Sequence, residues 1–321
     1  MNEFCFEATY GVYPTMITPY LENGEVDFRA VEALTEWYWL RGCDGIFADC
    51  QSSEIRFLTL DERVRILHTV MKKAQELAQR DPSRPRMTVV ASGHVSDAFA
   101  DQVRELTAIC AEKPDALILI SNRMDIANTS DDAWVADTDR LIAELPAEMP
   151  LGIYECPKPY KRLLTEKMLR YCVENGRFYF IKDTCCDADL IKQRLKICEG
   201  SHLKLFNANA QTLLETAKAG VFGYCGVMAN FHPDLYTRLL KGDLNSTRAS
   251  LLQDFLGLAA AIEGLTYPCC AKYYLDRFEG VAMQPDARSA AVRNLTAYQR
   301  SCVDQLAELT DAIRKQSGEQ K

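Results

Sequence analysis

Lys182 and Tyr154 are the two residues of this sequence best suited to carbonyl chemistry. Lys182 follows the strand-forming apolar run 178–181, where water is scarce. Desolvation disfavours the ammonium form of lysine and favours the neutral amine, which attacks carbonyl carbon. Tyr154 ends the similar run 151–153, 28 positions earlier, which is about one strand-helix repeat. We therefore expect an amine nucleophile and a proton-relaying phenol at one common rim.

Other residues follow similar apolar runs and are candidates for the same rim. They are Thr15, Thr18, Cys50, Gln51, Ser52, Ser53, Glu54, His94, Asn122, Arg123, Glu155, Asp183, Asn207, Asn209, Gly226, Met228 and Asn230. Arg123 could hold a distal carboxylate with two hydrogen bonds, or it could be a solvated loop residue. Glu155 could act as a base, or it could pair with Lys158 or Arg162. A structural role also stays open for Lys182, as the ion-pair partner of Asp183 or Glu155.

Composition and charge narrow the class of protein. The chain has 321 residues, of which 48% are hydrophobic and 26% charged, as in an ordinary globular protein. Its net charge of −8 argues against a nucleic-acid partner. The first residues lack the basic and apolar regions of a secretory signal, and no apolar run approaches the roughly 20 residues of a membrane span. We expect a cytoplasmic protein with no membrane partner.

The cysteines and histidines do not predict a metal site. Thirteen cysteines are scattered through the chain with no CxxC pattern, and two adjacent pairs occur at Cys185-Cys186 and Cys269-Cys270. In a reducing compartment we interpret them as small buried hydrophobic residues. Only four histidines accompany them, and they are dispersed. We expect no metal and no cofactor.

The elements that must position these residues form a repeat. Eight strand-like runs are expected at 11–17, 45–48, 87–91, 116–120, 151–154, 178–181, 203–206 and 220–225. Most are continuously apolar, as in a parallel sheet covered on both faces. They recur about every 30 residues, the spacing of one β/α unit, and the carboxyl ends of barrel strands carry the active site. The pattern predicts a (β/α)8 TIM barrel.

Helical segments separate the strands and continue after them. They are expected at 27–41, 60–80, 97–112, 131–145, 165–174, 187–199, 210–219 and 233–240, followed by 243–261, 270–277 and 289–315. We predict a barrel over residues 1–241 and a C-terminal helical appendage, 242–321, packed on it without a linker. A doubly wound sheet is the alternative fold, but a dinucleotide-binding version needs a GxGxxG loop that the first strand lacks.

The motifs at the strand ends share their order and spacing with one family. The chain carries Thr18-Pro19, then Gly24-Glu25-Val26-Asp27, Cys50-Gln51-Ser52-Ser53-Glu54, Tyr154-Glu155-Cys156-Pro157 and Ile181-Lys182-Asp183-Thr184. In these motifs, over about residues 11–230, it resembles the dihydrodipicolinate synthase/N-acetylneuraminate lyase family of (β/α)8 Schiff-base enzymes.

The resemblance implies a lyase or aldolase that makes or breaks a C–C bond in pyruvate or another 2-oxo acid, with an aldehyde as possible partner. Lys182 would form an iminium with the ketone, Tyr154 would relay protons, and Ser52 would be hydrogen-bonded to Tyr154. Backbone amides near Ser52 and Ser53 would hold the carboxylate. We predict Lys182, Tyr154 and Ser52 as catalytic. The predicted substrate-binding residues are Gln51, Ser53, Arg123, Glu155, Asn207 and Gly226.

The sequence also departs from the family pattern. Gln51 replaces a small hydroxyl residue, and Cys50 and Ser53 replace glycines. Asn122-Arg123 replaces a tyrosine pair, and the loop 158–162 is unlike that of the founding members. A second hypothesis is therefore a barrel that binds a 2-oxo acid without turnover, in a binding or regulatory role. Family members usually form tetramers, so we expect a homo-oligomer, either dimer or tetramer.

Overall fold

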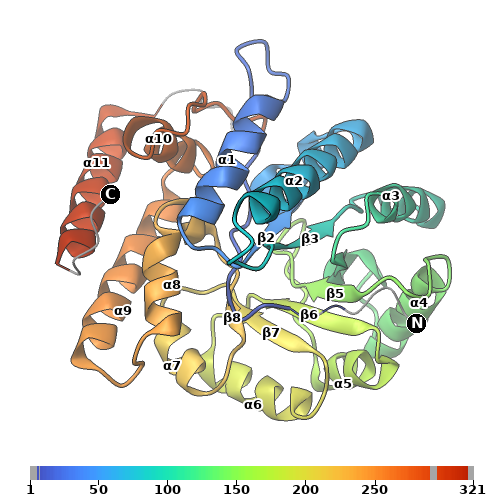
Figure 1. Cartoon of the computed structure of the whole chain (residues 1–321). Helices are drawn as coiled ribbons and strands as arrows, with labels where there is room; N and C mark the ends of the chain where they lie inside the picture. Colours follow the sequence, from blue (N-terminus) through green and yellow to red (C-terminus); the bar gives the residue numbers. More distant parts are fainter. Residues whose placement is uncertain (1–5, 7, 290–294, 317–321) are drawn as a thin grey trace.

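The strands form a closed parallel barrel ringed by helices (Figure 1). The computed structural model describes residues 6, 8–289 and 295–316. The strands are β1 (Gly11–Val12), β2 (Gly45–Ala48), β3 (Thr88–Ser92), β4 (Ala116–Ile120), β5 (Leu151–Tyr154), β6 (Phe178–Asp183), β7 (Lys204–Asn207) and β8 (Gly223–Tyr224). All neighbouring pairs are parallel, in the order β1-β8-β7-β6-β5-β4-β3-β2. A parallel bridge between Thr15 and Phe47 joins the two edges and closes the barrel.

One helix follows each strand. They are α1 (Phe28–Leu40), α2 (Leu60–Arg80), α3 (Phe99–Ala111), α4 (Asp131–Ile142), α5 (Glu166–Asn175), α6 (Ala188–Cys198), α7 (Leu213–Lys218) and α8 (Pro233–Lys241). Several begin at a side chain that caps the first turn, as Asp27 does for α1, Thr165 for α5 and Asp187 for α6. The structure thus confirms the predicted (β/α)8 barrel.

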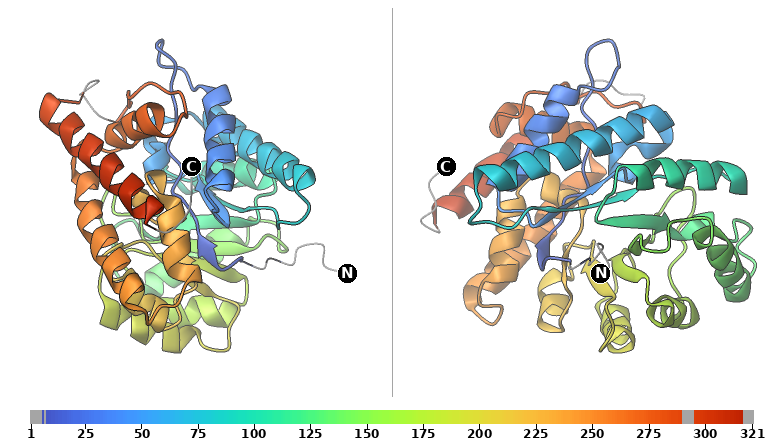
Figure 2. Two further views of the ribbon diagram at one scale, coloured as in Figure 1. Left: turned by 60° about the vertical axis from the view of Figure 1, so that its left-hand side comes forward. Right: turned by 45° about the vertical axis from the view of Figure 1, so that its right-hand side comes forward.

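Three further helices follow the barrel: α9 (Thr247–Ala259), α10 (Cys269–Phe278) and α11 (Ala297–Lys315). Helix α9 packs beside α7 and α8, and α10 packs against α11 (Figure 2). The C-terminal helical appendage is therefore present, while its division from the barrel at residue 241 stays a prediction. No helix in the described part of the chain is both long and apolar enough to cross a membrane.

Several predicted element ends are wrong. The first strand is Gly11–Val12 rather than 11–17, since Pro14 has no N–H for a sheet. The last is Gly223–Tyr224 rather than 220–225. Helix α9 begins after its N-cap Ser246, and α11 begins after its N-cap Thr296. The final helix was expected from 289; residues 290–294 lie outside the described residues.

The barrel interior is filled with aromatic rings below the carboxyl ends of the strands. Phe180 and Phe206 stack with ring centroids 4.4 Å apart, and Tyr13 contacts Phe206 edge-on at 4.6 Å. Phe47 lies edge-on to Tyr154 at 5.4 Å. These rings are buried, so this part of the barrel is a packed core rather than a channel.

Candidate active site

Lys182 and Tyr154 lie side by side on neighbouring strands. Their Cα atoms are partners in the register between β5 and β6. The Lys182 ammonium nitrogen is 4.1 Å from the centroid of the Tyr154 ring and 5.5 Å from that of Phe47. Lys182 is 4% exposed and Tyr154 3%. Both line a cavity of about 580 Å³, into which the loops that follow the strands also project.

The two carboxylates considered as partners of Lys182, those of Glu155 and Asp183, are held by an arginine. Arg194 forms ion pairs with Glu155, at 2.8 Å, and with Asp183. Glu155 also accepts hydrogen bonds from the backbone N–H groups of Leu164, at 2.7 Å, and Thr184, at 2.9 Å. The structural alternative, in which Lys182 pairs with Asp183 or Glu155, is therefore wrong. Among the described residues, Lys182 has no carboxylate oxygen within 4.0 Å.

Tyr154 contacts a thiol rather than a hydroxyl. Its phenol is hydrogen-bonded to the side chain of Cys156, whose thiol donates to Gln51 Oε1 at 3.3 Å. Burial raises the pKa of Tyr154 well above its usual value, and the neighbouring thiols act in the same direction. The phenol therefore stays protonated at neutral pH and can donate a proton. Gln51, which replaces a hydroxyl residue of the family motif, is therefore the last member of a hydrogen-bonded series that runs from Tyr154 through Cys156.

The predicted hydrogen bond between Ser52 and Tyr154 is wrong. Ser52 lines the cavity, but its hydroxyl donates to Thr15 Oγ1 at 3.0 Å. Ser52 and Thr15 are both hydrogen-bonded to the phenol of Tyr267, which also accepts from Asn230 Nδ2 at 3.1 Å. Ser52 therefore belongs to a second polar cluster of the cavity.

The loop after β2 turns tightly at Gln51–Ser53. Ser53 is buried within this turn: its hydroxyl donates to Met16 O at 2.6 Å and its N–H to Cys50 O at 3.0 Å. With both donors engaged and no place in the cavity lining, Ser53 shapes the loop instead of contacting a substrate. Gln51 and Ser52 do line the cavity, and their N–H groups, the first of the turn, have no partner within it.

Three more predicted substrate-binding residues lie outside the cavity lining. Arg123 is ion-paired with Asp97, and Glu155 is held by Arg194 as described. Asn207 donates through Nδ2 to the hydroxyls of Thr212 and Thr216, each at 2.9 Å. In the folded protein these side chains form ion pairs and hydrogen bonds that hold the loops in place. Of the predicted binding residues, Gln51 and Gly226 line the cavity.

His94 is also a structural residue. Its Nε2 accepts from the backbone N–H of Ile120 at 2.7 Å, and its Nδ1 contacts Gln102 at 3.0 Å. Burial lowers the pKa of His94 to about 4, so the imidazole is neutral at pH 7. It fixes the end of β4. In the described part of the chain, no three His, Cys, Asp or Glu side chains are grouped so as to hold a metal ion.

Sequence reasoning missed Tyr267, which comes from the segment before α10 and lines the cavity. Nothing local in the sequence distinguishes it from other loop tyrosines, because its position depends on how the C-terminal helices pack on the barrel. The charged residues Arg56, Lys158, Lys161 and Glu263 of the lining were also not predicted.

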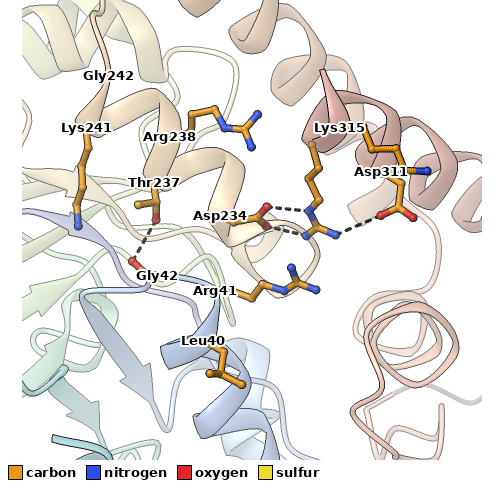
Figure 3. A pocket seen from close by; sticks show the side chains of 11 residues that line it. Leu40, Arg41, Gly42, Asp234, Thr237, Arg238, Lys241, Gly242, Asp311 and Lys315 are labelled. Atoms are coloured by element: carbon orange, nitrogen blue, oxygen red, sulfur yellow. Dashed lines mark hydrogen bonds and ion pairs between the residues drawn. The ribbon is translucent and has the colours of Figure 1, made fainter. Parts of the chain in front are cut away.

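A second cavity, of about 800 Å³, lies between the C-terminal ends of α1 and α8 and helix α11 (Figure 3). It is near the amino ends of the strands, where barrel residues usually serve stability. Its charges are compensated: Arg314 pairs with Asp234 at 2.7 Å, and Lys241 pairs with Asp44 at 2.6 Å. The Arg314–Asp234 pair ties α11 to the barrel, and we assign no reaction to this cavity.

Known proteins resemble this chain in sequence. The Dihydrodipicolinate synthetase family matches residues 8–79. A 4-hydroxy-tetrahydrodipicolinate synthase of Chelativorans sp. (strain BNC1) is 27% identical over 277 residues, which cover 83% of this chain and 87% of the relative. A second one, of Agrobacterium fabrum, is 25% identical over 84% of this chain and 88% of its own. In sequence the chain is thus similar to the Dihydrodipicolinate synthetase family and to its synthases.

Solved structures show the same fold. A dihydrodipicolinate synthase from Aquifex aeolicus superposes with a TM-score of 0.78 and 18% identity, over 94% of this chain and 98% of that one. A Ruminococcus gnavus sialic acid aldolase superposes with a TM-score of 0.81 and 19% identity, over 97% and 99%. The synthase relatives support an aldolase-type enzyme function for this chain.

Proposed function

We propose that this protein is a class I aldolase or lyase that binds pyruvate or another 2-oxo acid as an iminium on Lys182. The observation that carries the proposal is the placement of Lys182 beside Tyr154 in the cavity, with both neighbouring carboxylates occupied by Arg194. A buried lysine without a carboxylate partner is suited to be an amine nucleophile.

The proposed reaction starts with attack of the neutral Lys182 amine on the ketone carbon. The resulting carbinolamine loses water, and Tyr154 protonates the departing hydroxyl. In cleavage, the bond between C3 and C4 of the oxo acid breaks: the C4 hydroxyl loses its proton, C4 leaves as an aldehyde, and the electron pair forms an enamine with the iminium as electron sink. In synthesis the iminium loses a proton to give an enamine, which attacks an aldehyde. Tyr154, which lies beside Lys182, is our proposed group for exchanging the proton of the aldol oxygen.

Three features support binding of the oxo acid here. Gln51 and Ser52 present their side chains to the cavity, and their backbone N–H groups have no partner within the turn, so they are available to a carboxylate. The cluster of Ser52, Thr15 and Tyr267 adds hydroxyl groups beside this turn. The expected cytoplasmic location and homo-oligomer stay predictions.

Reductive trapping tests the proposal. Sodium borohydride with pyruvate should inactivate the protein and add a reduced pyruvyl group to Lys182, as located by peptide mass spectrometry. Lys272 is an internal control, because it is equally buried but ion-paired with Glu54, and it should stay unlabelled. Absence of any adduct across a saturating panel of oxo acids would refute the proposal. An adduct without steady consumption of the oxo acid would instead support binding without turnover.

A further inference from the structure

Four hydrogen-bonded residues meet at one wall of the active-site cavity. They are Thr15, Ser52 and Asn230, from the loops after β1, β2 and β8, and Tyr267, from the segment before α10. Ser52 and Tyr267 line the cavity, whereas Thr15 and Asn230 are fully buried. Tyr267 is half-buried. A ligand in the cavity can therefore reach the side chains of Ser52 and Tyr267.

The orientation of Asn230 limits where the phenol of Tyr267 can donate. Oδ1 of Asn230 accepts from the phenol of Tyr38 at 2.5 Å, so its Nδ2 is turned toward Tyr267, at 3.1 Å. An amide nitrogen donates and does not accept, so the O–H of Tyr267 is directed elsewhere. Tyr267 is also hydrogen-bonded to the hydroxyls of Ser52 and Thr15. Its hydrogen can turn from these hydroxyls to an acceptor in the cavity.

An anionic acceptor suits this phenol best. Burial raises the pKa of Tyr267 well above its usual value, so the phenol keeps its hydrogen at neutral pH. The hydroxyls of Ser52 and Thr15 are neutral acceptors, and a hydrogen bond to an ionised oxygen is roughly twice as strong as one to a neutral oxygen. A carboxylate that enters the cavity beside Ser52 therefore replaces a weak hydrogen bond of the phenol by a strong one.

Tyr267 and Ser52 are held at fixed positions relative to each other. Lys272 of α10, five residues after Tyr267, is ion-paired at 3.4 Å with Glu54, two residues after Ser52. The two segments are thus joined twice, once by this buried ion pair and once through the phenol. A group that is already held in place loses little conformational freedom on binding.

We infer that Tyr267 binds the carboxylate of the 2-oxo acid, by donating its phenol hydrogen to a carboxylate oxygen beside Ser52. This inference rests on the proposed function and adds a substrate-binding residue to it. The backbone N–H groups of Gln51 and Ser52, which have no partner within their turn, are available to the same carboxylate. Neutral donors from the barrel and from the C-terminal appendage then select a 2-oxo acid over a ketone without a carboxylate.

Pyruvate and hydroxyacetone test this inference, because both are methyl ketones and only pyruvate has a carboxylate. Trapping with sodium cyanoborohydride, which reduces an iminium in preference to a free ketone, gives the concentration for half-maximal labelling of Lys182 and needs no turnover. In Tyr267→Phe this concentration should rise about ten- to a hundred-fold for pyruvate, because one hydrogen bond to a charged group is lost. For hydroxyacetone it should change by less than about five-fold.

Two further variants and one rate separate binding from structural damage. The maximal labelling rate at saturating pyruvate should stay within about three-fold in Tyr267→Phe, because Lys182 and Tyr154 are unchanged. Ser52→Ala, which removes a hydroxyl partner of the phenol, should show the same selective loss for pyruvate. Tyr273→Phe is the matched control, since its phenol lies in the appendage and donates to Asp304 at 2.9 Å, and it should change neither concentration.

An unchanged half-maximal concentration for pyruvate in Tyr267→Phe, or equal losses for pyruvate and hydroxyacetone, would overturn the inference. Labelling of the wild-type protein by pyruvate would still support the proposed function in that case. Failure of every oxo acid to label Lys182 in the wild-type protein would overturn both.

Discussion

At the scale of single residues, the different surroundings of Lys182 and Tyr154 suit the first to be the proposed nucleophile and the second to be its proton donor. Lys182 lies over the ring of Tyr154, and the phenol of Tyr154 is hydrogen-bonded to Cys156. Because burial raises the pKa of Tyr154, the phenol stays neutral as pH rises through the physiological range. Cys156 and Gln51 orient this phenol in place of the small hydroxyl of the family motif.

We expect Tyr154→Phe to lower kcat by about 10²- to 10⁴-fold, the usual size of a general acid contribution. Because the amine is untouched, borohydride should still label Lys182 with pyruvate, though more slowly. Tyr298→Phe, at an exposed position on α11, is the control and should be neutral. Unchanged kcat in Tyr154→Phe, measured by steady-state kinetics, would assign proton transfer to another group.

Asp49, which follows β2, is a buried acid without a hydrogen-bond partner among the residues that the structure describes. Both of its carboxyl oxygens lack partners, and the residue has a φ of 50°. Burial raises its pKa well above the usual value, against the opposing effect of Arg63. The folded protein then holds a proton that the unfolded chain releases above about pH 4, so this residue lowers stability as pH rises from there toward the folded-state pKa.

Asp49→Asn should therefore stabilise the protein by about 1–3 kcal/mol at pH 8, and the gain should shrink toward pH 4, where the unfolded chain also begins to hold this proton. Urea unfolding at the two pH values measures this difference. Asp254→Asn, on the exposed face of α9, should show no such pH dependence. An equal effect of Asp49→Asn at both pH values would show that Asp49 is ionised in the folded state.

At the scale of elements, the ends of β5 and β6 are joined by one buried network. Arg194 of α6 pairs with Glu155, after β5, and with Asp183, at the end of β6, and its Nη2 donates to Leu164 O at 2.7 Å. This network fixes the spacing of the two strands that carry Tyr154 and Lys182. It also keeps both carboxylates away from the amine.

Arg194→Met should lower the free energy of unfolding by about 3–5 kcal/mol, because two carboxylates are left buried without a counter-charge. Arg170→Ala is the control, since its pair with Glu166 is exposed on α5, and it should change stability by less than about 0.5 kcal/mol. Chemical denaturation measures the free energy of unfolding of both variants. Similar small losses of unfolding free energy in both variants would mean that the network around Glu155 and Asp183 relaxes or admits water.

At the scale of the whole molecule, the C-terminal helices contribute to the cavity as well as covering the barrel. Tyr267 lines the cavity from the segment before α10. Lys272 of α10 reaches Glu54, and Glu54 also accepts from the backbone N–H of Ser289 at 2.7 Å. Arg314 of α11 pairs with Asp234 of α8. The ion pair between α10 and Glu54 and the ion pair between α11 and α8 therefore couple the appendage to the barrel.

We therefore expect barrel and appendage to unfold together, in one calorimetric transition whose calorimetric and van't Hoff enthalpies agree. Lys272→Met should lower the midpoint temperature and keep the single transition, because it leaves Glu54 without its counter-charge in the same cooperative unit. Two resolved transitions in scanning calorimetry would show that residues 242–321 form a separate domain.

Much of the fold and the centre of the site could be predicted from the sequence. Continuous apolar runs at even spacing predict parallel strands, and caps such as Thr59 mark helix starts, so α2 has the predicted bounds. Lys182 and Tyr154 each end an apolar run, and parallel strands bring such ends to one rim, where the structure places both. These are local signals, and each depends only on nearby residues.

The tertiary structure alone decided which polar side chains face the cavity. Glu155 and Asn207 lie at strand ends as Tyr154 does, but Arg194, Thr212 and Thr216 engage them elsewhere. Tyr267 enters the site from more than 80 residues beyond Lys182. Pairings of this kind depend on packing between distant elements, because a charged or hydrogen-bonding group binds whichever partner the folded chain brings near. Local sequence specifies the elements and not those partners.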